Sequence, residues 1–362
     1  MDTLTQFALG AGVGAAVLGR RIAPRKAALV GGVLGIVPDL DVLVAFDDPI
    51  DSFVLHRGAS HSLIVQAVVT PLFGEALMRL FKDLRQRRMA TYLAVYLVFA
   101  THALLDALTV YGTRLLWPLW TDAVGTGSVF IIDPIYTLPL LVALIWALCL
   151  GSWTPRFRTA LTACLAVSTA YLAWGLAAQQ IVHGRAARLL GDAGEGPERM
   201  LATPTPFNTL YWKVIAVDGE RYINLYLPVF GSAESVAAYA HPSGAGLAGC
   251  LAGLEALDKL ARFSDGFYRI DLHEGEFVVS DLRMGLTPNY VFGFAIAKQT
   301  DDGVRPISPE RRNGGRGTPG DLEWLFANLS GEFALRPAEA EAAVEDVRLS
   351  TLAESPENRT SC

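Results

Sequence analysis

Long apolar runs alternate with short polar stretches over the first half of the chain. Six such runs occupy residues 4–18, 27–46, 62–81, 90–110, 134–150 and 159–178. A helix needs about 20 mostly apolar residues to cross the hydrocarbon core of a membrane. The pattern therefore predicts an α-helical membrane domain with about six apolar helices, the first of them short or partly re-entrant.

The polar stretches after the first, third and fifth runs are basic, at residues 20–26, 82–88 and 156–158. Basic loops of membrane proteins stay on the cytoplasmic side. The alternation therefore predicts an integral membrane protein with these loops on the cytoplasmic side. Its non-cytoplasmic side is expected to hold the N-terminus, the loops at 47–61 and 111–133, and everything after residue 180.

The pattern changes near residue 184, where the chain takes on the composition of a water-soluble domain. Apolar and polar residues alternate over 210–227 around Asp218-Gly219, which predicts a β-hairpin. The expected division is a membrane-embedded metal-site domain at 1–183, a linker at 184–206, a smaller soluble α+β accessory domain at 207–336 and a polar, disordered tail at 337–362.

Composition supports a membrane protein and gives no sign of nucleic-acid binding. The chain is 52% hydrophobic and 18% charged, with a mean hydropathy of +0.34 and a net charge of −6. An acidic chain lacks the basic surface that binds nucleic acid. The lipid bilayer and a membrane-associated substrate are the expected partners.

Two carboxylates stand at the end of the second apolar run, at Asp39 and Asp41. Each carboxylate in a membrane segment costs about 2.5–3.5 kcal/mol on insertion scales, so a pair needs compensation. A divalent cation would supply it. The alternative is a helix end at the interface with solvated acids.

Histidines occur at the edges of the next two long apolar runs. His56 and His61 directly precede the third run, and His102 and Asp106 share one face near the end of the fourth. Imidazole with carboxylate suits Zn, Mn or Fe better than Ca or Mg. We therefore expect one or two divalent ions, zinc first, held by Asp39, Asp41, His56, His61, His102 and Asp106. A structural His–Asp hydrogen bond is the alternative for the last pair.

Other polar residues nearby suggest supporting roles. Arg57 would repel a metal, so we assign it to an anionic substrate group. Ser60 is expected to support the site or, with Ser62, to cap the next helix. Tyr111 and Thr113 are candidates for substrate binding, although a plain turn is an equal alternative.

The chain resembles the YdjM/DUF457 family of inner-membrane, metal-dependent hydrolases in residues 2–6, 38–41, 56–62, 102–106, 111–113 and 117–118. The resemblance covers roughly residues 1–180 and implies an integral protein of a bacterial inner (cell) membrane. It also implies a membrane-embedded hydrolase of unassigned substrate, with a more distant similarity to zinc-dependent phospholipase C enzymes. Members often have histidine where this chain has Gln6. That departure implies either one ligand fewer or a contact from Gln6 to a ligand rather than to the metal.

The leading hypothesis is hydrolysis of an ester or phosphoester, in a lipid or lipid-linked substrate, by a metal-activated water at the non-cytoplasmic face. Asp41 or Asp106 would accept the proton and Arg57 would hold negative charge. One rival is a transporter or metal-binding membrane protein whose Asp and His residues form an ion site. Another is a scaffold with a structural metal site.

Overall fold

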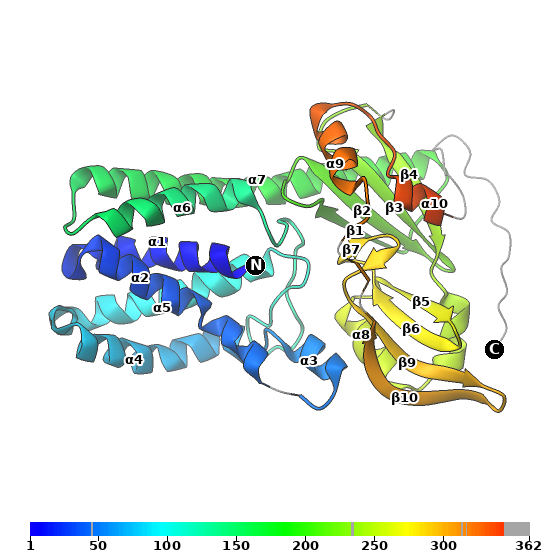
Figure 1. The fold of residues 1–362 in the computed structure, drawn as a ribbon, viewed down its shortest axis with the longest axis horizontal. Coiled ribbons are helices and arrows are strands. Elements are labelled where there is room, and N and C mark those ends of the chain that lie inside the picture. The colour runs from blue at the N-terminus through cyan, green and yellow to red at the C-terminus, as the bar shows by residue number, and fades with distance from the viewer. Residues whose placement is uncertain (45, 233–234, 313, 316, 344–362) are drawn as a thin grey trace. The chain divides into compact units, whose positions relative to one another are not determined.

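Figure 1 shows the fold in a computed structural model that describes residues 1–44, 46–232, 235–312, 314–315 and 317–343. The chain divides into two compact units. The first, here called the helical unit, consists of residues up to 45, 56–177 and 206–208. The second, here called the sheet unit, consists of residues 46–55, 178–205 and the chain from 209 onward.

The helical unit has a helix at each apolar run of the sequence. These are α1 (Thr3–Ile22), α2 (Pro24–Ile36), α4 (Leu63–Leu80), α5 (Arg88–Ala107), α6 (Pro134–Cys149) and the first part of α7 (Pro155–Asp192). Three short 3-10 turns join them: η1 (Pro38–Leu43), η2 (Ala59–His61) and η3 (Lys82–Arg87).

Three helical segments of the described chain are long and apolar enough to cross a membrane, at Leu63–Leu80, Lys82–Ala107 and Pro155–Asp192. The prediction of about six crossing helices is therefore not confirmed. Helix α2 has only 13 residues and α6 only 16. Helix α1 is long enough, but it is rich in glycine and carries two arginines in its last turn, which lower its hydropathy.

Glycines allow α1 and α2 to pack with their backbones in contact. A Cβ atom added to Gly31 would lie 2.2 Å from the carbonyl oxygen of Gly10, closer than real atoms approach. Gly14 and Gly35, each four residues further on, extend the same contact. Small residues at this spacing let two helices approach closely. The contact brings the end of α2 beside Gln6, whose carbonyl oxygen would lie 2.6 Å from a Cβ on Gly35.

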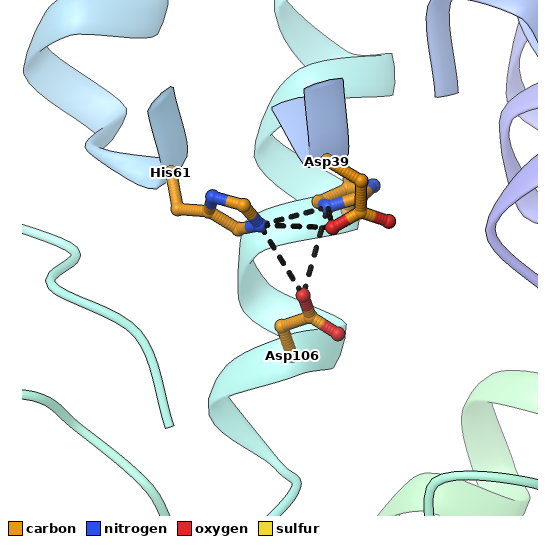
Figure 2. A group of neighbouring side chains, drawn as sticks. Asp39, His61 and Asp106 are labelled. Carbon is orange, nitrogen blue, oxygen red and sulfur yellow. Dashed lines mark hydrogen bonds and ion pairs between the residues drawn. The ribbon is translucent and has the colours of Figure 1, made fainter. Parts of the chain in front are cut away.

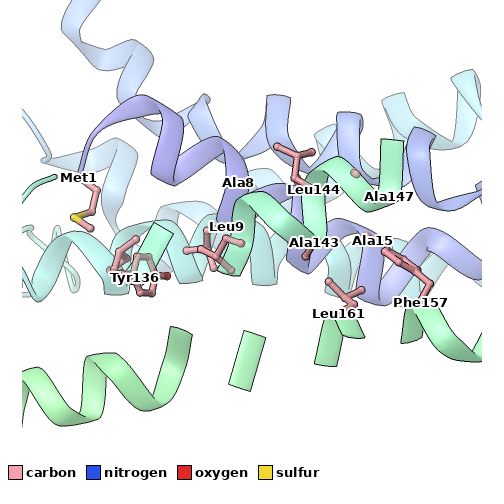
Figure 3. Close-up of a cluster of buried hydrophobic side chains, with 14 of the residues drawn as sticks. Met1, Ala8, Leu9, Ala15, Tyr136, Ala143, Leu144, Ala147, Phe157 and Leu161 are labelled. Atoms are coloured by element: carbon pink, nitrogen blue, oxygen red, sulfur yellow. The ribbon is translucent and has the colours of Figure 1, made fainter. Parts of the chain in front are cut away.

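The other side of α1 packs into an apolar core with α6 and α7 (Figure 3). Leu9 of α1, Leu144 of α6 and Leu161 of α7 belong to this cluster, and Ala8 and Phe157 in it are fully buried. Alanines at the contacts allow close packing, and larger side chains fill the space between the helices. Helix α1 is thus fixed on two sides.

Among its described residues, the sheet unit has two four-stranded antiparallel sheets and a small two-stranded one. The first has β1 (Arg199–Pro204), β2 (Tyr211–Asp218), β3 (Arg221–Pro228) and β4 (Ala237–Pro242) in sequence order. The second has the order β10 (Gly303–Arg312), β9 (Gly293–Thr300), β6 (Glu276–Asp281), β5 (Tyr268–His273). The small sheet pairs β7 (Gly285–Leu286) with β8 (Asn289–Tyr290), and the helices are α3 (Pro49–Leu55), α8 (Glu255–Phe263), α9 (Asp321–Ser330) and α10 (Pro337–Ala342).

The predicted hairpin at Asp218-Gly219 is present. Strands β2 and β3 pair in register from Tyr211 opposite Pro228 to Asp218 opposite Arg221. Gly219 has a φ of +51°, which a tight two-residue turn requires and glycine adopts without strain. The alternating pattern of the sequence therefore located this turn correctly.

Two segments have more regular structure than the sequence suggested. Helix α7 runs through part of the predicted linker, and β1 occupies another part of it. The end of α7 is amphipathic, because Ala178, Val182, Ala186 and Leu190 are buried at four-residue spacing between polar residues. In the predicted disordered tail, residues 337–342 form α10; residues 344–362 of that tail lie outside the described residues.

Candidate metal centre

Four of the six predicted ligands converge in the helical unit (Figure 2). Asp39 lies in η1, which directly follows α2, and His61 is the last residue of η2. His102 and Asp106 lie one turn apart on α5. Three segments that are distant in the sequence therefore each contribute to one cluster, as the positions of the polar residues predicted.

The four ligand atoms form a compact group. His61 Nε2 lies 3.1 Å from His102 Nε2, 3.4 Å from Asp39 Oδ1 and 3.3 Å from Asp106 Oδ2. His102 Nε2 lies 3.4 and 3.6 Å from the same two oxygens, and all four atoms lie within 4.8 Å of one another. Ligands about 2.0–2.1 Å from a tetrahedral zinc ion are about 3.3–3.4 Å apart. The five separations that involve a histidine nitrogen are therefore close to those of a tetrahedral site.

Hydrogen bonds on the far side of each imidazole fix which nitrogen faces the cluster. His102 Nδ1 lies 2.6 Å from the carbonyl oxygen of Gly35, which accepts only, so this nitrogen carries the proton. The Ser60 hydroxyl donates to Asp41 at 2.6 Å and lies 2.8 Å from His61 Nδ1, so it accepts from that nitrogen. In the neutral rings both Nε2 lone pairs thus point at each other and at two carboxylates. A cation between them relieves that repulsion.

Asp106 is held from several directions. Gln6 Nε2 donates to its Oδ1 at 3.1 Å, and the Met1 amino group also contacts that oxygen. Arg57 Nε lies 3.3 Å from Oδ2, which is buried and accepts no hydrogen bond. A buried carboxylate oxygen without a hydrogen-bond donor lowers the stability of the folded protein. A metal ion bound by Oδ2 would satisfy it, so the residues present fit a divalent cation.

Arg57 does not extend into solvent as an exposed substrate-binding group would. Its side chain is 9% exposed, its guanidinium lies over the Tyr111 ring at 5.0 Å from the centroid, and it donates to Thr109 Oγ1 at 3.3 Å. Its backbone has a φ of +60°, which is unusual for a residue other than glycine. Thr109 was not among the predicted site residues, although it lies one turn beyond Asp106.

Asp41 and His56 form a pair outside the four-residue cluster. His56 Nδ1 lies 2.9 Å from Asp41 Oδ1, and Asp41 Oδ2 also accepts from the Arg57 backbone at 3.0 Å. The two side chains are 16% and 26% exposed. The His56 ring centroid lies 6.2 Å from that of His61. This pair therefore borders the centre, at its more accessible side.

Of the remaining predicted residues, two contact a metal ligand directly, and the others have structural contacts. Gln6 contacts the ligand Asp106, and Ser60 contacts the ligand His61, so both lie one hydrogen bond away from the ligand atoms. Ser62, not Ser60, caps α4 by accepting from the next backbone amides. Tyr111 packs edge-on against His56, at 5.9 Å between ring centroids. Thr113 is buried and pairs through its backbone with Val124.

Access to the centre is on the side of Asp39. Its side chain is 23% exposed, whereas those of His61, His102 and Asp106 are at most 1% exposed. Apolar side chains next to it in the chain are exposed, with Leu40 at 51%, Val42 at 71% and Leu43 at 77%. The open side therefore has an apolar border.

The comparisons with known proteins agree with the motif resemblance. The model of the family described as YdjM inner membrane protein matches residues 1–182, and the chain belongs to that family. The inner membrane protein YbcI of Escherichia coli strain K12 is 34% identical over 108 residues, which is 29% of this chain and 60% of that relative. The chain thus spans less than two thirds of the relative's length. No solved structure matches the chain.

Family membership and the three candidate membrane helices together support an integral inner-membrane protein. The family match ends at residue 182, so it covers the candidate metal centre and very little of the sheet unit.

Proposed function

We propose that this member of the YdjM family is a metal-dependent hydrolase that cleaves an ester or phosphoester in a lipid or lipid-linked substrate at the non-cytoplasmic face of the membrane. One observation carries the proposal: the Nε2 atoms of His61 and His102 and one oxygen each of Asp39 and Asp106 converge with the spacing of metal ligands.

The chemistry of the donors favours zinc, with manganese or iron as alternatives. Two imidazoles and two carboxylates form a mixed nitrogen and oxygen set, which suits these ions better than calcium or magnesium. The two carboxylates of Asp39 and Asp106 would neutralise a divalent ion. With the ion neutralised, the positive charge of Arg57 beside Asp106 remains. This charge favours an anionic substrate group.

A bound divalent ion would lower the pKa of a water molecule and polarise the scissile group. This chain's own residues would handle the proton. His56 is the accessible imidazole beside the centre, and Asp41 holds it by a 2.9 Å contact. We assign His56 as the proton acceptor, supported by Asp41, in place of Asp106, which is fully buried and would itself be a metal ligand.

The surroundings of the site support a lipid substrate. Exposed apolar residues occur in η1 and also in the loop between α5 and α6. That loop exposes Leu116, Leu119 and Trp120, with Leu119 83% exposed. This loop is joined to the site segment by a hydrogen bond from Ser62 to the Trp117 carbonyl. Exposed apolar and aromatic side chains at the end of a membrane domain are typical of residues at the lipid interface. A lipid head group would reach the centre without leaving the bilayer.

The charge pattern supports the proposed side of the membrane. The basic stretches at 20–26, 82–88 and 156–158 belong on the cytoplasmic side by the positive-inside rule. The first of these lies at the opposite end of α2 from Asp39, and the second at the opposite ends of α4 and α5 from His61 and Asp106. This arrangement supports a site at the non-cytoplasmic face.

The test is phospholipid turnover by the full-length protein in lipid nanodiscs, measured as release of phosphorylated head group, with and without added zinc. His56→Ala should keep its metal but lose about 100-fold or more in turnover, because a proton acceptor contributes about that much. His61→Ala should lose both the bound metal and the turnover. His183→Ala, an exposed histidine of α7, is the matched control and should change neither.

The same geometry favours a second candidate function, a structural metal site. Four protein ligands that fill a tetrahedron are typical of structural zinc, whereas catalytic zinc keeps a position open. The partial exposure of Asp39 is the feature that favours catalysis. A chelator that lowers thermal stability while the wild-type protein turns over none of the lipid, lipid-linked or simple ester substrates offered would support the structural role.

A further inference from the structure

Positive charges gather at the end of the helical unit that lies away from the metal centre. Figure 1 shows the α1–α2, α4–α5 and α6–α7 turns at this end. Six exposed basic residues, here called the basic patch, lie at the first and last of these turns: Arg20, Arg21, Arg25, Lys26, Arg156 and Arg158. We propose that the basic patch, together with Trp153, binds the head group of a phospholipid that carries two phosphate groups.

A turn of one residue brings the first four charges together. Helix α1 ends at Ile22 and α2 begins at Pro24, so only Ala23 separates them. Ala23 has a φ of +70°, which is unusual for a residue other than glycine and reverses the chain sharply. A Cβ atom on Gly14 would lie 2.7 Å from the carbonyl oxygen of Ala27, so the two helices stay in contact close to this turn. The four basic side chains are therefore held near one another despite their mutual repulsion.

Trp153 connects the α6–α7 turn to the same place. A Cβ atom on Gly19 would lie 2.7 Å from the Trp153 ring, so the indole packs directly against the backbone of α1. The Arg20 guanidinium lies over this ring, at 5.5 Å from its centroid. Trp153 also packs edge-on against Phe157, which lies between the first two arginines of α7, at 5.5 Å between ring centroids. One aromatic ring thus joins both sets of charges and holds a guanidinium in position before an anion binds.

The described chain supplies no counter-charge to the basic patch. Residues 3–38 and 134–177 contain neither Asp nor Glu, and none of the six side chains forms an ion pair with another described residue. The α4–α5 turn differs, because Arg88 there contacts Glu75, and Arg85 Nε donates to the Met78 carbonyl at 3.0 Å. Like charges held together destabilise a folded state, and a bound anion removes that cost. The basic patch therefore favours an external anion.

The position of the basic patch in the membrane domain indicates a lipid as the source of that anion. Trp153 lies two residues before Pro155, where a candidate membrane helix begins. Tryptophan at the ends of membrane helices lies at the level of the lipid head groups. The basic side chains around it therefore reach the phosphate layer.

The number and arrangement of the charges favour two phosphates over one. Four charges come from the α1–α2 turn and two from the start of α7. Basic pockets between membrane helices bind head groups with more than one phosphate. Cardiolipin, which has two phosphates joined by a glycerol, is therefore the matching probe. Such a site would work on either side of the membrane and without the metal centre, because phosphates occur in both leaflets.

Native mass spectrometry of the full-length protein in detergent tests this site, with cardiolipin, phosphatidylglycerol and phosphatidylcholine of matched acyl chains as probes. The wild-type protein should bind about one cardiolipin, about 10-fold or more tightly than phosphatidylglycerol. Arg20→Gln combined with Arg156→Gln should weaken cardiolipin binding about 10-fold or more, because each basic residue near an anionic lipid contributes about fivefold. Trp153→Leu, which keeps an apolar side chain against α1, should weaken binding about threefold by releasing Arg20.

The matched control is Lys82→Gln combined with Arg87→Gln, which removes the same charge from the α4–α5 turn. It should change cardiolipin binding less than about twofold, whereas the positive-inside rule alone predicts equal losses in the two double variants. The single variants Arg20→Gln and Arg156→Gln, each about fivefold weaker than wild type, decide the question if a double variant unfolds.

Three results would overturn the proposal. These are equal losses in the two double variants, no preference of the wild type for cardiolipin over phosphatidylglycerol, and displacement of cardiolipin by an equal concentration of inorganic pyrophosphate. The last result would assign the basic patch to a soluble phosphate instead of a lipid. Metal content should stay at the wild-type level in every variant, so a failure here leaves the proposed metal centre untouched.

Discussion

Single hydrogen bonds decide what the two histidines present to the cluster. His102 is oriented by the carbonyl of Gly35 and His61 by the hydroxyl of Ser60. Each bond holds the proton on Nδ1 and leaves Nε2 free to bind a cation. Contacts of this kind tune metal affinity nearly as much as the ligands do.

Ser60→Ala is therefore expected to weaken zinc affinity about 10- to 100-fold without removing a ligand. The substitution releases His61 Nδ1 and deprives Asp41 of a donor. Chelator competition measures the affinity. Ser62→Ala, two residues on, is the contrast: it removes the cap of α4 and should cost about 1 kcal/mol of stability while affinity stays the same. Identical affinity in Ser60→Ala and wild type would argue against the assigned tautomer.

Residue types alone identified all four members of the cluster but could not separate them from Asp41 and His56. Asp39 and Asp41 are two apart on a short turn, and His56 and His61 lie on irregular backbone. Neither segment has a periodicity from which side-chain direction follows. The common direction of His102 and Asp106 was easier to predict, because a spacing of four on a helix places both side chains on one face.

At the scale of elements, the packing of α1 on α2 positions the centre. Gly10 and Gly31 let the helices touch, and this contact places Gly35 where its carbonyl accepts from His102. The four-residue spacing of Gly10 and Gly14, and of Gly31 and Gly35, was visible in the sequence as the signal for such packing.

Gly31→Ala should lower both the thermal midpoint and the zinc affinity, because its Cβ would meet the Gly10 carbonyl and push the helices apart. A cost of about 1–3 kcal/mol is expected, as for other overpacked contacts. Thermal unfolding in detergent and chelator competition measure the two effects. The matched control is Gly184→Ala in α7, where an added Cβ meets nothing within 4 Å; it should be neutral or slightly stabilising. A neutral Gly31→Ala would contradict the proposed contact.

Long elements were predictable, and short ones were not. Every long apolar run holds a helix, because hydrophobic length is a strong signal. Helix α3 has seven residues in an acidic loop, and its Phe53 packs against aromatic rings that lie more than 200 positions later in the chain. No local pattern could reveal that partner.

At the scale of the whole molecule, the C-terminal end of the described chain is fixed by a buried carboxylate. Glu339 of α10 accepts from Tyr226 at 2.8 Å and contacts His241 at 3.0 Å and Arg336 at 3.1 Å. Burial raises the pKa of Glu339, but the contact with His241 and the charge of Lys213 outweigh it, so the pKa lies below its usual value. Its charged form therefore stabilises the sheet unit.

A depressed pKa gives stability that is fully present above about pH 4.5, the usual value for Glu, and that is lost as pH falls further. Glu339→Gln should cost about 3 kcal/mol at pH 7, because Arg336 and Lys213 lose their partner. The difference from wild type should persist from pH 7 down to about pH 4.5 and narrow as the pH falls further. Urea unfolding followed by tryptophan fluorescence measures both proteins, and a difference that does not change with pH would refute the assignment.

The central claim is that the helical unit holds a metal ion through Asp39, His61, His102 and Asp106. The most direct measurement is the metal content per chain, by mass spectrometry, of protein purified without chelator. We predict about one divalent ion per wild-type chain, with zinc favoured over manganese and iron. The His61→Ala and His102→Ala variants should hold almost none, and His183→Ala should hold the wild-type amount. A wild-type protein without metal, or His61→Ala and His102→Ala variants that keep it, would contradict the account.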